Sequence, residues 1–190
     1  MKSSVGNFPQ KRPAAGALGS LVIIMLMGAN TLWANDQPQR AAAPQQSECE
    51  LNDQQQAMLS QVNEARSQTR QCGDQAFESA EPLTWNCKLE AAAESHSSDM
   101  AENDYFSHTT PDGAGIEQRV GDQDYLWQAV GENIAAGHTS VSAVVAGWLE
   151  SPGHCRNIMN DAFTEMGAAK AENAQSRYST YWTQTLGRPR

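Results

Sequence analysis

Four cysteines constrain the fold of this chain more than any other feature of its sequence. They are Cys49, Cys72, Cys87 and Cys155, and all of them follow residue 48. An even cysteine count in an exported protein predicts two disulfides, and three pairings are open at this point. A zinc site of four thiolates is the alternative, but no two cysteines have the C-x2–4-C spacing that such a site uses.

The N-terminus predicts the export that disulfides require. The only charges in residues 1–34 are three basic residues, and they precede a short apolar run at 21–29. A helix rises about 1.5 Å per residue, so this run is too short for a ~30 Å hydrocarbon core. We therefore predict a secretory signal peptide over 1–34, cleaved after Ala34 or alternatively after Ala29. An uncleaved membrane anchor is the competing interpretation.

The charge balance of the chain excludes two classes of partner. Its 190 residues carry 13 Lys+Arg and 22 Asp+Glu, a formal net charge of −9. Removal of the three basic residues of the signal leaves ten against 22, or −12. A sequence-independent nucleic-acid binder needs a cationic surface, and anionic lipid attracts polybasic segments. We expect no nucleic-acid partner and no membrane span in the exported chain.

The exported chain divides into a short linker and one folded domain. Residues 35–46 contain two prolines, three alanines and four glutamines, a composition typical of flexible segments. We predict a linker over 35–48 and a domain over 49–190.

The spacing of apolar residues predicts the elements of this domain. Helices are predicted where apolar residues recur at helical spacing, and strands where short β-prone runs flank a polar loop. The predicted helices cover about 52–70, 86–103 and 140–151, and the predicted strands cover 166–171 and 178–185. The stretch before residue 130 is expected to be a loop with one short helix. Helices followed by a hairpin indicate an α+β layered fold.

The histidines and one glutamate are the candidates for chemistry. His96 lies on the apolar face of a predicted helix and is expected in the core, whereas His138 is expected at the surface. His108 and His154 lie at element boundaries, and Glu132 adjoins a short apolar run. Two histidines and a glutamate suit an open zinc site, although their gaps of 24 and 22 residues match no local metal motif. Ordinary loop histidines and a solvated glutamate are the alternative.

Eight segments that are weak signals alone occur together in a specific order. They lie at 62–66, 82–86, 89–101, 105–108, 131–137, 148–159, 166–167 and 181–184. The ordered set resembles the CAP (SCP) superfamily of cysteine-rich secretory proteins, insect venom antigens and plant pathogenesis-related proteins, and its bacterial branch in particular. The resemblance implies a three-layer α-β-α sandwich with a central antiparallel sheet.

The resemblance also implies a surface cleft with a His/Glu cluster, which in some family members binds a divalent cation, often zinc. His108 matches the first cleft histidine, Glu132 matches the glutamate of a Gly-Glu-Asn motif, and His154 follows in the bacterial Ser-Pro-Gly-His form. Tyr181 replaces the family's second histidine. Because a tyrosine has a reference pKa of about 10, it is a poor zinc ligand at neutral pH, and we place it at the cleft rim.

The bacterial branch further implies the cysteine pairing. Its members often carry one cysteine just after the first helix and another after the Ser-Pro-Gly-His histidine. This pattern implies a disulfide between Cys72 and Cys155, which leaves Cys49 for Cys87.

Two functions follow from the resemblance. The first is an exported binding or interaction module, periplasmic or extracellular, whose ligand is a small apolar molecule such as a lipid or sterol, a cell-wall component or a protein. The alternative is a metal-dependent extracytoplasmic hydrolase or protease. In that case zinc on His108, Glu132 and His154 would polarise a water, and Glu150 is the nearest spare carboxylate for a base.

Overall fold

The computed structural model describes residues 49–190, so the predicted signal peptide and linker lie outside the described residues. The described residues form five helices and six strands. In chain order they are α1 (Asp53–Arg66), β1 (Arg70–Cys72), β2 (Gln75–Phe77), β3 (Thr84–Trp85), α2 (Cys87–Glu102), α3 (Ile116–Asp122), β4 (Trp127–Ala136), α4 (Val141–Glu150), α5 (Pro152–Met159), β5 (Glu165–Glu172) and β6 (Thr180–Pro189).

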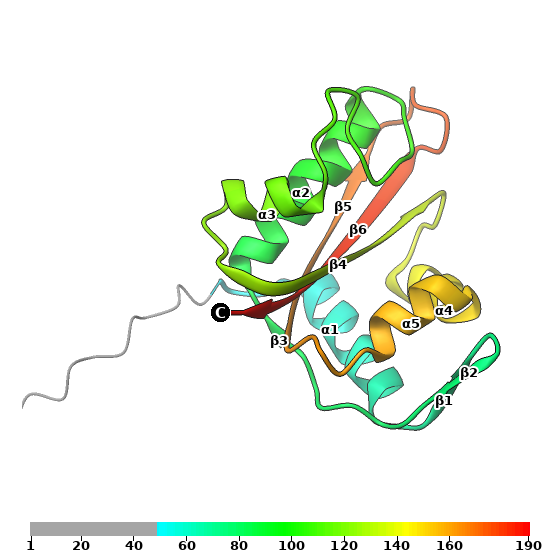
Figure 1. Cartoon of the computed structure of the whole chain (residues 1–190). Coiled ribbons are helices and arrows are strands. Elements are labelled where there is room, and N and C mark those ends of the chain that lie inside the picture. Colours follow the sequence, from blue (N-terminus) through cyan, green and yellow to red (C-terminus); the bar gives the residue numbers. More distant parts are fainter. Residues whose placement is uncertain (1–48) are drawn as a thin grey trace, which may run out of the picture. The chain divides into compact units, whose positions relative to one another are not determined.

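A four-stranded sheet forms the middle layer of this domain, with the strand order β3-β5-β6-β4. β6 pairs antiparallel with both β4 and β5, and the short β3 pairs parallel with the start of β5. Helices α2 and α3 lie on one side of the sheet, and α1, α4 and α5 lie on the other (Figure 1). The fold is thus the α+β, α-β-α sandwich that the resemblance implies.

Polar caps fix where three of the helices begin. The side chain of Asn52 accepts from the backbone N–H of Gln55, whose own side chain accepts from the N–H of Asn52. Asn86 caps α2, and Ser140 caps α4. Each cap satisfies backbone donors that have no partner within the helix.

The last strand, β6, lies at the centre of the core. Residues 180–186 are all buried, because helices cover both faces of the strand and other strands cover both of its edges. Trp182 and Leu186 pack with the α1, α4 and α5 layer, whereas Tyr181 packs with Met100 and Ala101 of α2.

Two segments differ from the elements that the sequence predicts. β4 begins at Trp127, inside the stretch expected to be a loop, and it contains Gly131, Glu132 and Asn133, which have low strand propensity. Its pairing with β6 outweighs that propensity. The β1–β2 hairpin was not predicted, and it begins where helix α1 was expected to continue.

Two disulfides tie the helices to the rest of the domain. Cys49 is bonded to Cys87, the first residue of α2, and Cys72 of β1 is bonded to Cys155 of α5. This is the pairing that the resemblance implies. The bridged cysteines are separated by 38 and 83 residues respectively. Within residues 49–190, no helix is both long and apolar enough to cross a bilayer.

Candidate functional site

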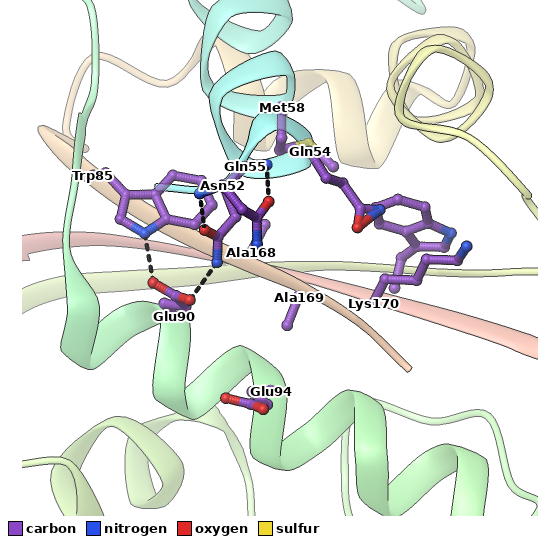
Figure 2. A pocket seen from close by; sticks show the side chains of 11 residues that line it. Asn52, Gln54, Gln55, Met58, Trp85, Glu90, Glu94, Ala168, Ala169 and Lys170 are labelled. Carbon is purple, nitrogen blue, oxygen red and sulfur yellow. Dashed lines mark hydrogen bonds between the residues drawn. The ribbon is translucent and has the colours of Figure 1, made fainter. Parts of the chain in front are cut away.

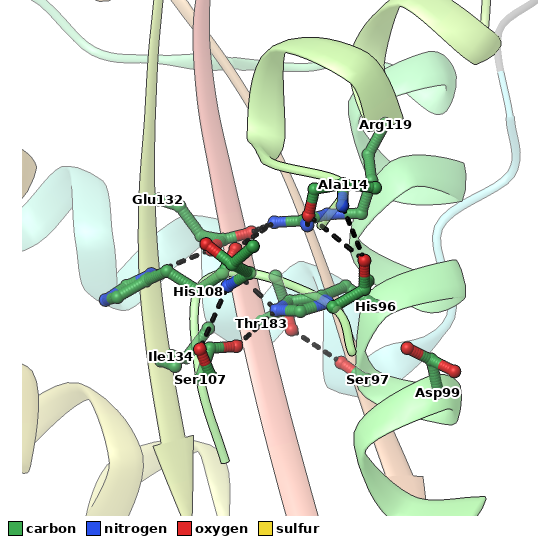
Figure 3. Close-up of polar contacts among 12 residues, drawn as sticks. His96, Ser97, Asp99, Ser107, His108, Ala114, Arg119, Glu132, Ile134 and Thr183 are labelled. Atoms are coloured by element: carbon green, nitrogen blue, oxygen red, sulfur yellow. Dashed lines mark hydrogen bonds and ion pairs between the residues drawn. The ribbon is translucent and has the colours of Figure 1, made fainter. Parts of the chain in front are cut away.

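The carboxylate of Glu132, on β4, is the centre of a polar cluster (Figure 3). One of its oxygens accepts from Nδ1 of His108 at 2.8 Å, and the other accepts from the guanidinium of Arg119 at 2.6 Å. The side chains of Glu132 and Arg119 are only 4% and 6% exposed. Burial raises the pKa of Glu132, but the hydrogen bond from His108 and the charge of Arg119 outweigh it and hold the pKa below its ordinary value.

His96 of α2 lies beside this carboxylate, fully buried as the sequence predicts. Its Nε2 is 2.9 Å from the C=O of Ser107 and 3.9 Å from the nearer oxygen of Glu132. A carbonyl only accepts, so Nε2 carries the proton and Nδ1 is left as an acceptor. Among the described residues Nδ1 has no partner. Burial lowers the pKa of His96, which favours the neutral ring.

His108 is the exposed member of the cluster, with a side chain that is 57% exposed. A carboxylate is an acceptor, so the Nδ1 that faces Glu132 carries the proton. The other ring nitrogen, Nε2, is then an acceptor when the ring is neutral. His108 and Arg119 approach Glu132 from opposite sides (Figure 3). The cluster therefore holds one solvent-exposed imidazole in place with a buried ion pair.

A buried set of amide side chains positions Glu132 against α5 and β6. Nδ2 of Asn157 donates to the C=O of Glu132 at 3.0 Å and to Oδ1 of Asn133 at 2.9 Å. Nδ2 of Asn133 in turn donates to Oε1 of Gln184 at 2.9 Å and to the C=O of His154 at 3.2 Å. These bonds fix the start of α5 against β4, and with it the position of His154.

His154 is half-buried near the start of α5. Burial lowers its pKa, and the positive charge of a protonated His108 lowers it further. The structure thus brings His108 directly onto Glu132. It joins His154 to the site through its backbone, whose C=O accepts from Asn133.

Two other candidates lie away from the cluster. Tyr181 is fully buried against α2, and its hydroxyl donates to Asp104 at 3.2 Å, so the predicted rim position is wrong. It is buried because β6 is covered on both faces. Glu150 is exposed as the last residue of α4. No contact described for residues 49–190 joins it to Glu132 or His108.

Arg119 is the functional candidate that the sequence predictions missed. It lies on α3 between Ile116 and Val120, which pack in the core, so its helical position faces inward. An arginine on the apolar side of a short helix predicts a buried acidic partner. That signal was available in the sequence, but it does not identify the partner, which the structure shows to be Glu132 of β4.

The donor set at this site does not fit a zinc ion. Both oxygens of Glu132 accept from side chains of the chain itself, and one of these donors is a cation. A metal on this carboxylate would lie beside the guanidinium of Arg119, whose positive charge opposes a second cation there. In the described part of the chain, no three His, Cys, Asp or Glu residues are grouped so that they could hold a metal.

Sequence comparison identifies the family. Residues 59–186 match the cysteine-rich secretory protein family (CAP), and the chain belongs to this family. It is 32% identical over 103 residues to the uncharacterized protein YkwD of Bacillus subtilis, and the aligned region covers 54% of this chain and 38% of YkwD. It is also 36% identical over 85 residues to the uncharacterized membrane protein YlbC of the same organism. This alignment covers 45% of this chain and 25% of YlbC. The matches cover well under half of either relative.

Solved structures show the same fold. An extracellular SCP-domain protein of Bacillus anthracis aligns with a TM-score of 0.59 and 31% identity, over 71% of this chain and 40% of that one. An outer surface protein of Borrelia burgdorferi aligns with a TM-score of 0.58 and 21% identity, over 73% of this chain and 97% of that one.

Proposed function

We propose that this chain is an exported binding module that recognises its ligand at the exposed imidazole of His108. The observation that carries the proposal is the arrangement around Glu132, where a buried ion pair orients a histidine that is itself open to solvent. When the ring is neutral and its Nδ1–H donates to Glu132, Nε2 is free to accept a hydrogen bond. It therefore suits a ligand group that donates a hydrogen bond, such as a hydroxyl.

Two exposed aromatic side chains supply apolar surface close to His108 in the chain. Phe106 is 44% exposed and precedes His108 by two residues, and its ring packs edge-on against Tyr178, which is 39% exposed. An exposed aromatic pair and a hydrogen-bond acceptor together suit a small molecule with an apolar body and a hydroxyl group. This chemistry favours the lipid or sterol class over a purely polar ligand.

Export of this chain is part of the proposal. Two disulfides and the predicted N-terminal secretory signal support a periplasmic or extracellular location. The names of the two structural relatives place those proteins outside the cell or at its surface.

Ligand binding is tested with purified protein. Organic extraction and mass spectrometry should recover a hydroxylated apolar molecule, and binding of that molecule should weaken about tenfold or more in His108→Ala and in Phe106→Ala. Leu126→Ala is the matched control, because Leu126 is also an exposed apolar side chain, at 73%, but belongs to another loop. An empty extract, or equal binding by all variants, would contradict the proposal.

The metal-dependent alternative is tested separately by zinc analysis. Because Arg119 already pairs with Glu132, we expect the wild type to hold no more zinc than His108→Ala or Glu132→Ala at micromolar supply. Stoichiometric zinc lost in both variants would restore the metal proposal. The hydrolase alternative also needs a base, and Glu150 is not at the cluster.

A further inference from the structure

The sheet lacks a strand along most of the outer edge of β5. β3 pairs with β5 only at Glu165 and Met166, and the N–H of Asn86 then donates to the C=O of Met166 at 2.8 Å. At this point the chain turns away into α2, whereas β5 continues to Glu172. The position beside the second half of β5 is filled by no strand of the described chain.

Alternate residues of β5 direct backbone groups toward this open position. The C=O of Met166 bonds toward β3, so the N–H and C=O of Ala168 and Lys170 point the same way. Within residues 49–190 these groups have no hydrogen-bond partner on that side. Such an edge is a template for an incoming extended chain.

A cavity of about 270 Å³ occupies the place of the missing strand (Figure 2). Its floor is the edge of β5, and its two walls are the first turns of α1 and α2. It is lined by Asn52, Gln54, Gln55, Met58, Trp85, Glu90, Glu94, Ala168, Ala169, Lys170 and Trp182. Because one helix flanks each face of β5, the cavity is a slot in the plane of the sheet.

The shape of this slot favours a single extended peptide over a second copy of the domain. A second copy that paired edge to edge would bring the helices on its own sheet against α1 and α2. A single extended peptide has no helices packed on it, so it can enter the slot without this clash. The volume is also slightly below the range of about 300–1,000 Å³ typical of small-molecule pockets, which suits a few residues of chain.

Charge in the slot indicates which side chain the peptide carries. A Cβ on Gly167 would lie 2.0 Å from the backbone of Glu90, so this residue and Ala169, two further along, face α2. A peptide residue opposite Ala169 would face the same wall, which is acidic.

Two glutamates make that wall acidic. Glu90 accepts from Nε1 of Trp85 at 2.7 Å and from the side chain of Gln55. Glu94 is exposed and has no ionic partner among residues 49–190. On the floor of the slot, Lys170 of β5 is already paired with Glu172, and its Nζ lies 5.5 Å from the ring centroid of Trp182. The free charge in the slot is therefore negative.

We propose that this slot, lined by β5, α1 and α2, binds an extended peptide as an added strand, with a basic side chain directed at Glu94. The backbone of Ala168 and Lys170 supplies the hydrogen bonds, and Glu94 supplies the preference for lysine or arginine. This site is separate in its residues from the His108 cluster, and it does not depend on the function proposed there.

The test uses the full chain and the acetylated, amidated pentapeptide Thr-Val-Lys-Val-Thr. Binding should shift the amide NMR signals of Ala168 and Lys170 and slow their hydrogen exchange. Two further peptides carry N-methyl groups, one on both valines and one on the central lysine. A strand bonds through alternate residues, so one methylated peptide should bind at least tenfold more weakly and the other should bind as the parent does. Equal binding by both, or no binding at millimolar peptide, would overturn the proposal.

The charge preference has its own control. Glu94→Gln should weaken the lysine peptide about two- to fivefold, as for an exposed ion pair, and should leave a glutamine-substituted peptide unchanged. Glu102→Gln is the matched control, because Glu102 is an exposed acid on the same helix that does not line the slot. If both variants weaken binding equally, only the overall negative charge is involved and Glu94 is not the determinant. If the amides of Ala168 and Lys170 exchange slowly in the absence of peptide because the protein dimerises, the β5 edge pairs with a second copy of the chain and the peptide proposal is wrong.

Discussion

The ion pair between Glu132 and Arg119 lies almost entirely out of water, and each partner depends on the other. Removal of one partner leaves the other charge buried and unpaired, which typically costs about 3–5 kcal/mol. We expect Glu132→Gln to lower the free energy of unfolding by about this amount in urea denaturation. The double variant Glu132→Gln/Arg119→Met should recover a large part of the loss, because no charge is then stranded. Strictly additive effects of the two changes would contradict a coupled pair.

Two residues of the cluster make stability depend on pH in the same direction. Burial lowers the pKa of His96 in the folded chain. Below about pH 6.5 the unfolded chain therefore binds a proton at this residue more readily than the folded chain does, and this favours unfolding. The folded pKa of Glu132 is also lowered, so its stabilising contribution is present above the unfolded value of 4.5 and is lost as pH falls through the folded pKa. Stability should therefore decrease from about pH 6.5 downward.

Thermal unfolding at a series of pH values measures this dependence. In His96→Gln, which keeps a donor for the C=O of Ser107, the fall in Tm between about pH 6.5 and 5 should become shallower. The slope that remains in this range belongs to His154, whose folded pKa is also lowered by burial. A profile identical to that of the wild type would show that His96 does not carry the upper part of the transition.

At the scale of elements, α2 and β5 approach so closely that only glycine fits between them. A Cβ at Gly167 would lie 2.0 Å from the backbone N of Glu90 and 2.4 Å from the backbone C of Leu89. Because neither backbone can yield without moving the helix, Gly167→Ala should destabilise the domain by about 3 kcal/mol or more. Gly121→Ala in α3 is the control, since a Cβ there meets nothing within 4 Å, and it should be neutral or slightly stabilising. Equal Tm values for the two variants would contradict the close contact.

The end of α1 is held to the end of α5 by a buried arginine. The guanidinium of Arg66 donates to the carbonyls of Glu81, Ile158 and Asn160 at 2.7–2.9 Å. A lysine cannot reach several carbonyls in this planar arrangement, so Arg66→Lys should lower the free energy of unfolding by about 3 kcal/mol. Chemical denaturation measures the loss, and the exposed Arg177→Lys should change stability by less than about 0.5 kcal/mol.

The sequence predicts an element well where neighbouring residues determine its structure, and poorly where pairing with a distant strand determines it. Helices α2 and α4 begin within a residue of the predicted starts at 86 and 140, because Asn86 and Ser140 cap their own helices. β4 was partly missed, since its central Gly-Glu-Asn has no strand propensity and is held by β6, about fifty residues later in the chain. The same non-locality hid Arg119, whose meaning depends on a glutamate from another element.

At the scale of the whole molecule, the two disulfides constrain different parts of the unfolded chain. In the chain-entropy model, closure of loops of 38 and 83 residues contributes about 4 and about 4.5 kcal/mol. We expect the Cys72→Ser/Cys155→Ser variant to lose more stability than the Cys49→Ser/Cys87→Ser variant, and full reduction to lose more than either. Denaturation with and without a reductant measures these differences. A reduced protein as stable as the oxidised one would show that the bridges are dispensable.

The central place of β6 in the sheet has a consequence for the order in which the domain is assembled during synthesis. Both β4 and β5 pair with β6, and neither pairs with the other. A nascent chain that has reached only Glu172 therefore carries two strands without the partner that joins them, and its main layer cannot close. Cooperative folding has to wait for the final described strand. For the export proposed above, this delay would keep the chain open enough to be threaded across a membrane before it becomes compact.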